Sequence, residues 1–236
     1  MSRVLIIIGG YNSIWPVYLK LARDLEDLSG LRAVGVPLMP WDWWQANRAQ
    51  DASNLLAEVA ETVAWARRRF RAEQFIQVGH SAGGVLARLY LSDQPLWGQV
   101  YAGLEHVLAL ITLGSPHASA KGEHTEWFLT DQANRLVPGT AYAERVRYLS
   151  VAGRFVQGRQ DGSYRERRAF RAYQFFDGRG EVWGDGIVPV ETASLEGAET
   201  IVLEGVAHSR KFGPHWYGGS KAIIRRWWPA EVQDAG

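Results

Sequence analysis

A glycine-flanked serine between an apolar strand and a helix constrains this chain most. Residues 79–84 read Gly-His-Ser-Ala-Gly-Gly, after the apolar run 74–78 and before a helical pattern from 82 to about 91. In G-x-S-x-G the serine sits on a sharp, strained turn, and the flanking glycines avoid clashes that a Cβ would cause. The turn lifts the Oγ of Ser81 above the carboxyl end of a sheet, at a helix N-terminus. We therefore predict that Ser81 is a nucleophile.

A phosphate-binding loop and a chance glycine-rich connection are the alternatives to a nucleophile at this turn. A Walker loop would need Gly-Lys-Ser/Thr, and a dinucleotide-binding loop would need G-x-G-x-x-G. Residues 79–84 have neither spacing. The strand before the serine and the helix after it favour the nucleophile.

Strands and helices alternate along the chain. Apolar runs predict strands over 4–8, 32–37, 74–78, 106–113, 147–151 and 199–203, and a period near 3.6 predicts helices over 14–28, 53–70, 82–91 and 220–228. Residues 40–44 are predicted to form a loop or a partial turn. Alternation of this kind predicts an α/β fold with about six mostly parallel strands, flanked by helices on both faces.

Domain organisation follows from the length and from two breaks in the alternation. An α/β fold of 236 residues often forms one domain, so we predict a single domain over 1–236. Residues 114–146 and 153–184 are long, polar and glycine-containing, with interleaved aromatic residues. Loops of that length usually serve function or have structure of their own, so both are candidate lid or cap insertions.

Composition excludes several classes of site and partner. The chain has no cysteine, which excludes disulfides, thiolate catalysis and cysteine-based zinc sites. The chain has no long run of one charge, and its net charge is +1, so nucleic acid is not expected as a partner. No apolar stretch approaches the roughly 20 residues of a membrane span, and the run 4–8 is too short for a signal peptide. We expect a cytoplasmic protein without metal or cofactor; the oligomeric state stays open.

A serine hydroxyl needs a base, and the base needs a carboxylate to orient it. After a nucleophile of this kind the partners follow in the order serine, acid, histidine. His208 emerges directly after the strand 199–203, at the edge where Ser81 lies, and is favoured over His215. His80 is expected to point away from the site and pack. The base is therefore predicted to be His208.

The predicted acid is Asp185, in the segment 183–189, Trp-Gly-Asp-Gly-Ile-Val-Pro. Its glycine neighbours allow a sharp turn that brings the carboxylate inward, although Asp-Gly turns are common for other reasons. Asp185 follows the fifth strand and precedes the predicted base, which fits the order. The rivals are Asp161, Asp177 and Glu191.

The oxyanion that forms on attack needs two N–H donors. The first is expected to be the backbone N–H of Ala82, directly after the nucleophile. The second should come from the loop after the first strand, residues 9–11. We predict Tyr11, with Gly10 as the alternative.

The segments 79–84, 114–117 and 185–189, together with His208, resemble the lipase branch of the α/β-hydrolases, including GPI-inositol-deacylase-like proteins. Gly9-Gly10-Tyr11 with Trp15 is similar to the oxyanion loop of that branch, although Ile8 stands where a histidine usually precedes the glycine. The resemblance spans residues 4 to about 228. It implies an α/β-hydrolase fold, reduced at its N-terminus, and an esterase or lipase-like activity.

Eleven tryptophans, many of them outside the predicted elements, suggest an aromatic-lined acyl pocket or lid; ordinary loop packing is the alternative. Candidate substrate contacts are Trp15, His117, Trp127 and Val188. The predicted reaction is hydrolysis of a small-molecule carboxylic ester, with an apolar acyl chain, through an acyl-enzyme. Acyl transfer and thioester hydrolysis would use the same triad, and a ligand-binding pseudoenzyme would have lost it.

Overall fold

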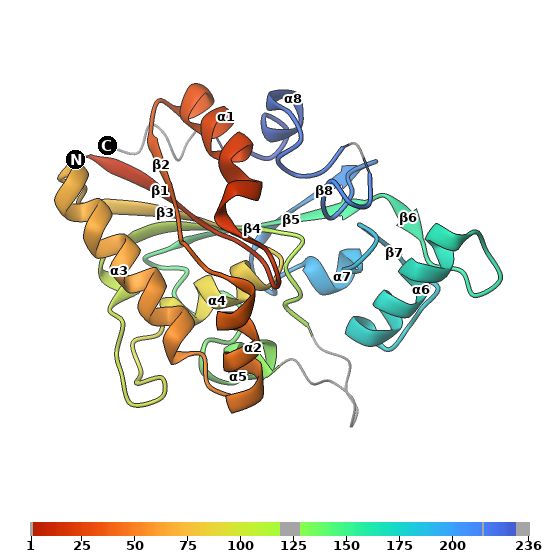
Figure 1. Ribbon diagram of the computed structural model, residues 1–236, viewed down its shortest axis with the longest axis horizontal. Helices are drawn as coiled ribbons and strands as arrows, with labels where there is room; N and C mark the ends of the chain where they lie inside the picture. The colour runs from red at the N-terminus through yellow and green to blue at the C-terminus, as the bar shows by residue number, and fades with distance from the viewer. Residues whose placement is uncertain (1, 119–127, 214, 230–236) are drawn as a thin grey trace.

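A parallel sheet forms the centre of the computed structural model, which describes residues 2–118, 128–213 and 215–229 (Figure 1). Its strands run in the order β2-β1-β3-β4-β5-β8, and each neighbouring pair is parallel. They are β1 (Arg3–Ile8), β2 (Arg32–Gly35), β3 (Gln74–His80), β4 (Val107–Leu113), β5 (Arg147–Arg154) and β8 (Glu199–Glu204). The predicted α/β fold with six strands is confirmed.

Helices cover both faces of the sheet. One face carries α2 (Pro40–Ala49), α3 (Ser53–Phe70), α4 (Ala82–Tyr90) and α5 (Phe128–Leu136), and the other carries α1 (Leu19–Ser29) and α8 (Lys221–Ile224) (Figure 1). Short helices are η1 (Trp15–Tyr18), η2 (Gly103–Glu105) and α7 (Val190–Ala193). The described residues contain no helix with both the length and the hydrophobicity of a membrane span.

The two faces of the sheet explain the unbroken apolar strands. In β1, Val4, Ile6 and Ile8 belong to the core beneath α3 and α4. Leu5 and Ile7, which alternate with them, belong to the core beneath α1 and α8. Because successive side chains of a strand point to opposite faces, a strand covered on both sides is apolar at consecutive positions, as β1 is from Val4 to Ile8.

Residues 40–44 correct one prediction, because they form the first half of α2 rather than a loop. Pro40 stands at the start of the helix, where its missing N–H costs nothing. The carboxylate of Asp42 accepts a hydrogen bond from the backbone N–H of Met39, 2.8 Å away, and so caps the first turn. The helix ends at Ala49, and Gln50, whose φ is 53°, caps it.

The two long stretches that break the alternation contain secondary structure. The first contains α5, against α4. The second contains a small antiparallel pair, β6 (Val156–Gln157) and β7 (Trp183–Gly184), with α6 (Tyr164–Asp177) between them. Figure 1 shows β6, α6 and β7 together as an arm at the end of the molecule farthest from the N-terminus. Their role as a lid or cap stays a prediction.

Candidate active site

Ser81 stands between β3 and α4 with φ 55° and ψ −129°, a conformation that residues with a Cβ rarely adopt. Close contacts of the neighbouring glycines hold this turn. A Cβ on Gly79 would lie 2.4 Å from the Cα of Gly84, and one on Gly83 would lie 2.3 Å from the carbonyl oxygen of Ile8. The glycines therefore allow the strand, the turn and the helix to approach each other closely enough to form the elbow.

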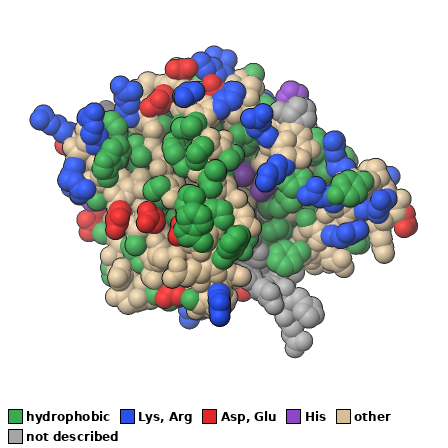
Figure 2. All heavy atoms as spheres, viewed as in Figure 1, with side chains coloured by type: hydrophobic (Ala, Val, Ile, Leu, Met, Phe, Trp, Pro, Cys, Tyr) green, Lys and Arg blue, Asp and Glu red, His purple; other side chains and the backbone are tan. Residues whose placement is uncertain are grey.

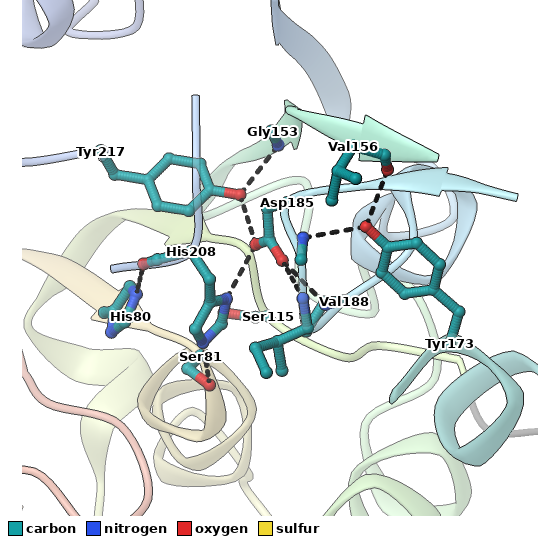
Figure 3. Close-up of polar contacts among 12 residues, drawn as sticks. His80, Ser81, Ser115, Gly153, Val156, Tyr173, Asp185, Val188, His208 and Tyr217 are labelled. Carbon is teal, nitrogen blue, oxygen red and sulfur yellow. Dashed lines mark hydrogen bonds and ion pairs between the residues drawn. The ribbon is translucent and has the colours of Figure 1, made fainter. Parts of the chain in front are cut away.

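His208 joins Ser81 to Asp185 (Figure 3). Its Nε2 lies 3.0 Å from the Oγ of Ser81, and its Nδ1 lies 2.8 Å from Oδ2 of Asp185. A carboxylate only accepts hydrogen bonds, so the proton of a neutral His208 is on Nδ1 and its Nε2 is free to accept from the serine hydroxyl. The three residues that the sequence analysis predicted thus lie in hydrogen-bonding order.

The carboxylate of Asp185 is completely buried and is stabilised by several donors. Oδ1 accepts from the backbone N–H groups of Ile187, at 3.0 Å, and Val188, at 2.8 Å. Oδ2 accepts from the hydroxyl of Tyr217 at 2.8 Å, beside the bond from His208 (Figure 3). A buried carboxylate is tolerated only with such donors, so the turn stabilises its charge as well as its position.

Tyr217 and Tyr173 complete this arrangement and were not predicted from the sequence. The Tyr217 hydroxyl accepts from the backbone N–H of Gly153 at 2.8 Å while it donates to Asp185. Burial, together with the charge of Asp185, raises its pKa well above the ordinary value, so it stays a donor. The Tyr173 hydroxyl accepts from the N–H of Gly186 at 2.9 Å and donates to Val156. Only folding brings these tyrosines together, and no local motif marks them.

The loop after β1 lies directly against Ser81. A Cβ on Gly10 would lie 2.7 Å from the Cβ of Ser81. The Gly10 N–H donates to the hydroxyl of Tyr18 at 2.9 Å, so it already has an acceptor. Ala82 is the first residue of α4, where backbone N–H groups have no partner within the helix. Tyr11 and Ala82 stay the predicted oxyanion donors.

His80 connects this loop to the loop of His208. Its Nε2 lies 2.9 Å from the carbonyl oxygen of His208, and its Nδ1 lies 2.9 Å from the hydroxyl of Tyr18. Burial, and the charge of His208, lower the pKa of His80 to about 3. Because a carbonyl oxygen only accepts, the proton of the neutral ring is on Nε2, and Nδ1 accepts from Tyr18. His80 is packed as predicted, although it also binds the backbone of the predicted base.

The rival residues lie in other surroundings. His215 is exposed, and its carbonyl oxygen accepts from the N–H of Ala207. Asp177 and Glu191 both pair with Arg179. The side chain of Asp161 is exposed on the arm. The chain order used above had already favoured Asp185 and His208 over these residues.

Three predicted substrate contacts pack against the protein: Trp15 is partly buried, and Val188 and His117 are buried. The ring of Trp15 covers Gly35, since a Cβ there would lie 1.7 Å from it. Val188 is buried with Ala152 and Ala193 in a small core, so its backbone rather than its side chain serves the site. His117 is also buried. Contact of these residues with a substrate stays a prediction; Trp127 lies outside the described residues.

His117 belongs to a buried polar cluster under α4 and α5. Its Nε2 lies 3.0 Å from the hydroxyl of Thr112, and its Nδ1 lies 3.3 Å from the guanidinium of Arg88. Burial, and the charge of Arg88, lower the pKa of His117 well below its ordinary value, so its Nδ1 can accept from the guanidinium. Arg88 is fully buried and also donates to the carbonyl oxygen of Val137, 2.7 Å away, just beyond α5. The cluster thereby fixes α5 to α4.

A pocket of about 140 Å³, lined mostly by apolar and aromatic side chains, opens near the loop after β1. Its walls come from that loop, α2, α5 and α6. The lining residues are Tyr11, Trp43, Ala46, Asn47, Phe128, Leu129 and Phe175. Figure 2 shows hydrophobic side chains on the body of the molecule and on the arm, with histidine atoms visible between them.

Comparisons with known proteins agree with this architecture. Residues 46–152, just under half of the chain, match the family model described as a PGAP1-like alpha/beta domain. The lipase of Staphylococcus hyicus superposes with a TM-score of 0.57 at 11% identity, over 95% of this chain and 94% of the lipase. The lin2722 gene product of Listeria innocua superposes with a TM-score of 0.53 at 14% identity, over 97% and 93%. No curated protein matches the chain. At these identities the structures show a shared fold.

Proposed function

We propose that this chain, which has the α/β-hydrolase fold, is a serine hydrolase that cleaves carboxylic esters through Ser81, His208 and Asp185. The observation that carries the proposal is the hydrogen-bonded series from Ser81 Oγ to His208 Nε2, 3.0 Å, and from His208 Nδ1 to Asp185 Oδ2, 2.8 Å. The strained backbone of Ser81 supports it, because strain of this kind persists where function requires it.

The reaction begins when His208 takes the hydroxyl proton of Ser81 and the Oγ attacks the ester carbonyl carbon. The N–H groups of Ala82 and Tyr11 stabilise the negative charge on the carbonyl oxygen, and each such donor is worth about a hundred- to a thousandfold in rate. His208 then gives its proton to the leaving alcohol, and an acyl-enzyme remains. Water, deprotonated by His208, attacks the acyl-enzyme; the carboxylic acid leaves as His208 returns the proton to the Oγ of Ser81. Asp185 stabilises the imidazole whenever it is protonated.

The proposed substrate is a small-molecule ester with an apolar acyl group. The apolar pocket beside Tyr11 supports this substrate class. Acyl transfer to an alcohol or amine, and thioester hydrolysis, would use the same residues. Mass spectrometry of the products distinguishes these reactions from ester hydrolysis: added alcohol would give a new ester in acyl transfer, and an added thioester would give a free thiol in thioester hydrolysis.

The proposal is tested by labelling the folded protein with a fluorophosphonate and measuring its intact mass. We expect one adduct on the wild type and on the control Ser209→Ala, and none on Ser81→Ala. Hydrolysis of p-nitrophenyl acetate should fall by at least a thousandfold in Ser81→Ala. An adduct that persists in Ser81→Ala would contradict the assignment. A folded wild type without an adduct or any ester hydrolysis would favour a ligand-binding protein.

A further inference from the structure

The pocket is bordered by buried apolar side chains on one side and by exposed side chains on the other. Its floor consists of Trp43, Ala46, Phe128 and Leu129, which are buried. At the mouth, Tyr11 is 36% exposed and Phe175 is 44% exposed, and Asn47 is the exposed polar lining residue. The ring of Tyr11 contacts that of Trp43 edge to face, with centroids 6.0 Å apart. A ligand would therefore enter past Tyr11 and Phe175 and end against the side chains of α2 and α5.

The loop after β1 links the pocket to the nucleophile. Tyr11, which lines the pocket, directly follows Gly10, whose Cα faces the Cβ of Ser81. The leaving alcohol must lie toward His208, because this residue protonates it. The described lining residues come from the oxyanion loop, α2, α5 and α6, and not from the loop that carries His208. The position thus suits the acyl side of the ester rather than the alcohol.

We infer that this pocket binds the acyl group and restricts it to a short chain or a single aromatic ring. The inference rests on the proposed function and names its substrate class. The pocket volume is about 140 Å³. An apolar cavity of roughly 150 Å³ in another protein holds one benzene molecule, which sets the size of the group that fits. The acyl groups of butyrate, hexanoate and benzoate esters fit this volume. The end of a decanoyl chain would remain outside it.

The experiment is a series of p-nitrophenyl esters, from acetate through butyrate and hexanoate to decanoate, with benzoate. Burying one methylene group is worth about a fourfold gain in kcat/KM. We expect kcat/KM to rise on the order of 100-fold from acetate to hexanoate, and to stop rising or to fall at decanoate. A continued rise to decanoate, or equal values for all esters, would overturn the inference while leaving the ester hydrolase in place.

Two variants tie the size limit to this pocket. Ala46→Leu extends a side chain from the floor, so the gain in kcat/KM from acetate to hexanoate should shrink at least tenfold. Leu129→Ala enlarges the floor and should move the optimum toward decanoate. Trp41→Ala is the matched control on α2, because Trp41 is 58% exposed and does not line the pocket. If neither pocket variant changes the dependence of kcat/KM on acyl-chain length, the acyl group binds elsewhere and the inference is wrong.

A second measurement decides the inference even if no ester is hydrolysed. Saturation-transfer NMR of benzoate reports binding without chemistry. We expect a benzoate signal with the wild type and with Trp41→Ala, and its loss with Ala46→Leu. Equal signals from all three proteins would overturn the pocket assignment. Loss of hydrolysis with a normal benzoate response would instead overturn the proposed function alone.

Discussion

The imidazole of His80 donates a hydrogen bond from Nε2 to the backbone carbonyl oxygen of His208, 2.9 Å away (Figure 3). On its other side His80 accepts from Tyr18, whose hydroxyl accepts from the N–H of Gly10. A buried chain of hydrogen bonds thus connects the loop of the predicted oxyanion donors to the backbone of the predicted base. Replacement of its central ring should disturb both loops together.

We expect His80→Ala to lower kcat for p-nitrophenyl butyrate about 10- to 100-fold, with a smaller change in KM. The substitution removes the hydrogen bonds of His80 to the His208 carbonyl and to the Tyr18 hydroxyl, which misplaces groups that act in the transition state. His106→Ala is the control, since His106 lies at the opposite end of the sheet, beside Arg67. Equal kcat values in His80→Ala and the wild type would show that the loops hold their positions without the bridge.

The same histidine should make folding stability depend on pH. The pKa of His80 is about 3 in the folded protein, because of burial first and the charge of His208 second, against 6.5 in the unfolded chain. Between these values the unfolded chain binds a proton that the folded protein does not, so stability falls as pH decreases below 6.5. At pH 5 the loss is about 2 kcal/mol from this residue. Urea unfolding at pH 5 and 7.5 measures it.

His117 should contribute to the pH dependence in the same direction, since burial lowers its pKa too. The contribution of His80 is isolated with His80→Gln, which cannot titrate. Its free energy of unfolding should change less between pH 7.5 and 5 than that of the wild type. An unchanged pH slope in this variant would mean that His80 gains its proton with little cost in the folded state.

Tyr217→Phe and Tyr173→Phe form a matched pair. Each removes a hydroxyl that accepts from a backbone N–H, and each should cost about 1–3 kcal/mol of unfolding free energy. Only the Tyr217 hydroxyl also donates to Asp185 Oδ2. We therefore expect kcat to fall about tenfold in Tyr217→Phe and less than twofold in Tyr173→Phe. Steady-state kinetics at several pH values would show the difference, and equal losses would indicate a structural role for both.

Gly10→Ala should inactivate the protein without unfolding it. The added Cβ would lie 2.7 Å from the Cβ of Ser81, so the loop must move away from the nucleophile. We expect kcat to fall about a hundredfold, which is the effect of losing one oxyanion donor. Gly30→Ala is the control: its new Cβ meets nothing within 4 Å, but its φ of 71° makes it strained. It should lower stability by about 1 kcal/mol and leave kcat unchanged.

Arg88→Met should loosen α5 and, through it, the floor of the acyl pocket. The guanidinium donates to the Val137 carbonyl at 2.7 Å and to Asn134 at 3.2 Å. Loss of these bonds should cost about 2–4 kcal/mol, and hexanoate hydrolysis should fall more than acetate hydrolysis. Arg135→Met, at an exposed position of α5, should change neither. Thermal unfolding measures the loss of stability, and the ester series measures the change in specificity. Equal losses of hexanoate and acetate hydrolysis would show that the Arg88 cluster does not shape the pocket.

The sequence predicted the features that depend on local patterns. The boundaries of α3 agree with the prediction, because its apolar residues repeat with the helical period, and Ser81 is marked by its glycines. Residues 40–44 misled the prediction because a proline next to tryptophans resembles a loop, whereas the cap from Asp42 starts a helix. Tyr217 could not be found in this way, since its contact with Asp185 joins segments 32 residues apart. The pocket likewise exists only where four separate segments meet.

Helix α6 connects two properties that selection usually changes separately. Tyr173 on this helix holds the backbone beside Asp185 through Gly186, and Phe175, two positions later, stands at the mouth of the pocket. A mutation that shifts α6 to admit a different substrate therefore also strains the turn that carries the proposed acid. In proteins with this architecture, new specificities should arise first from substitutions in α2 and α5, where side chains can change size without moving the turn of Asp185. The arm should stay constrained in length and sequence.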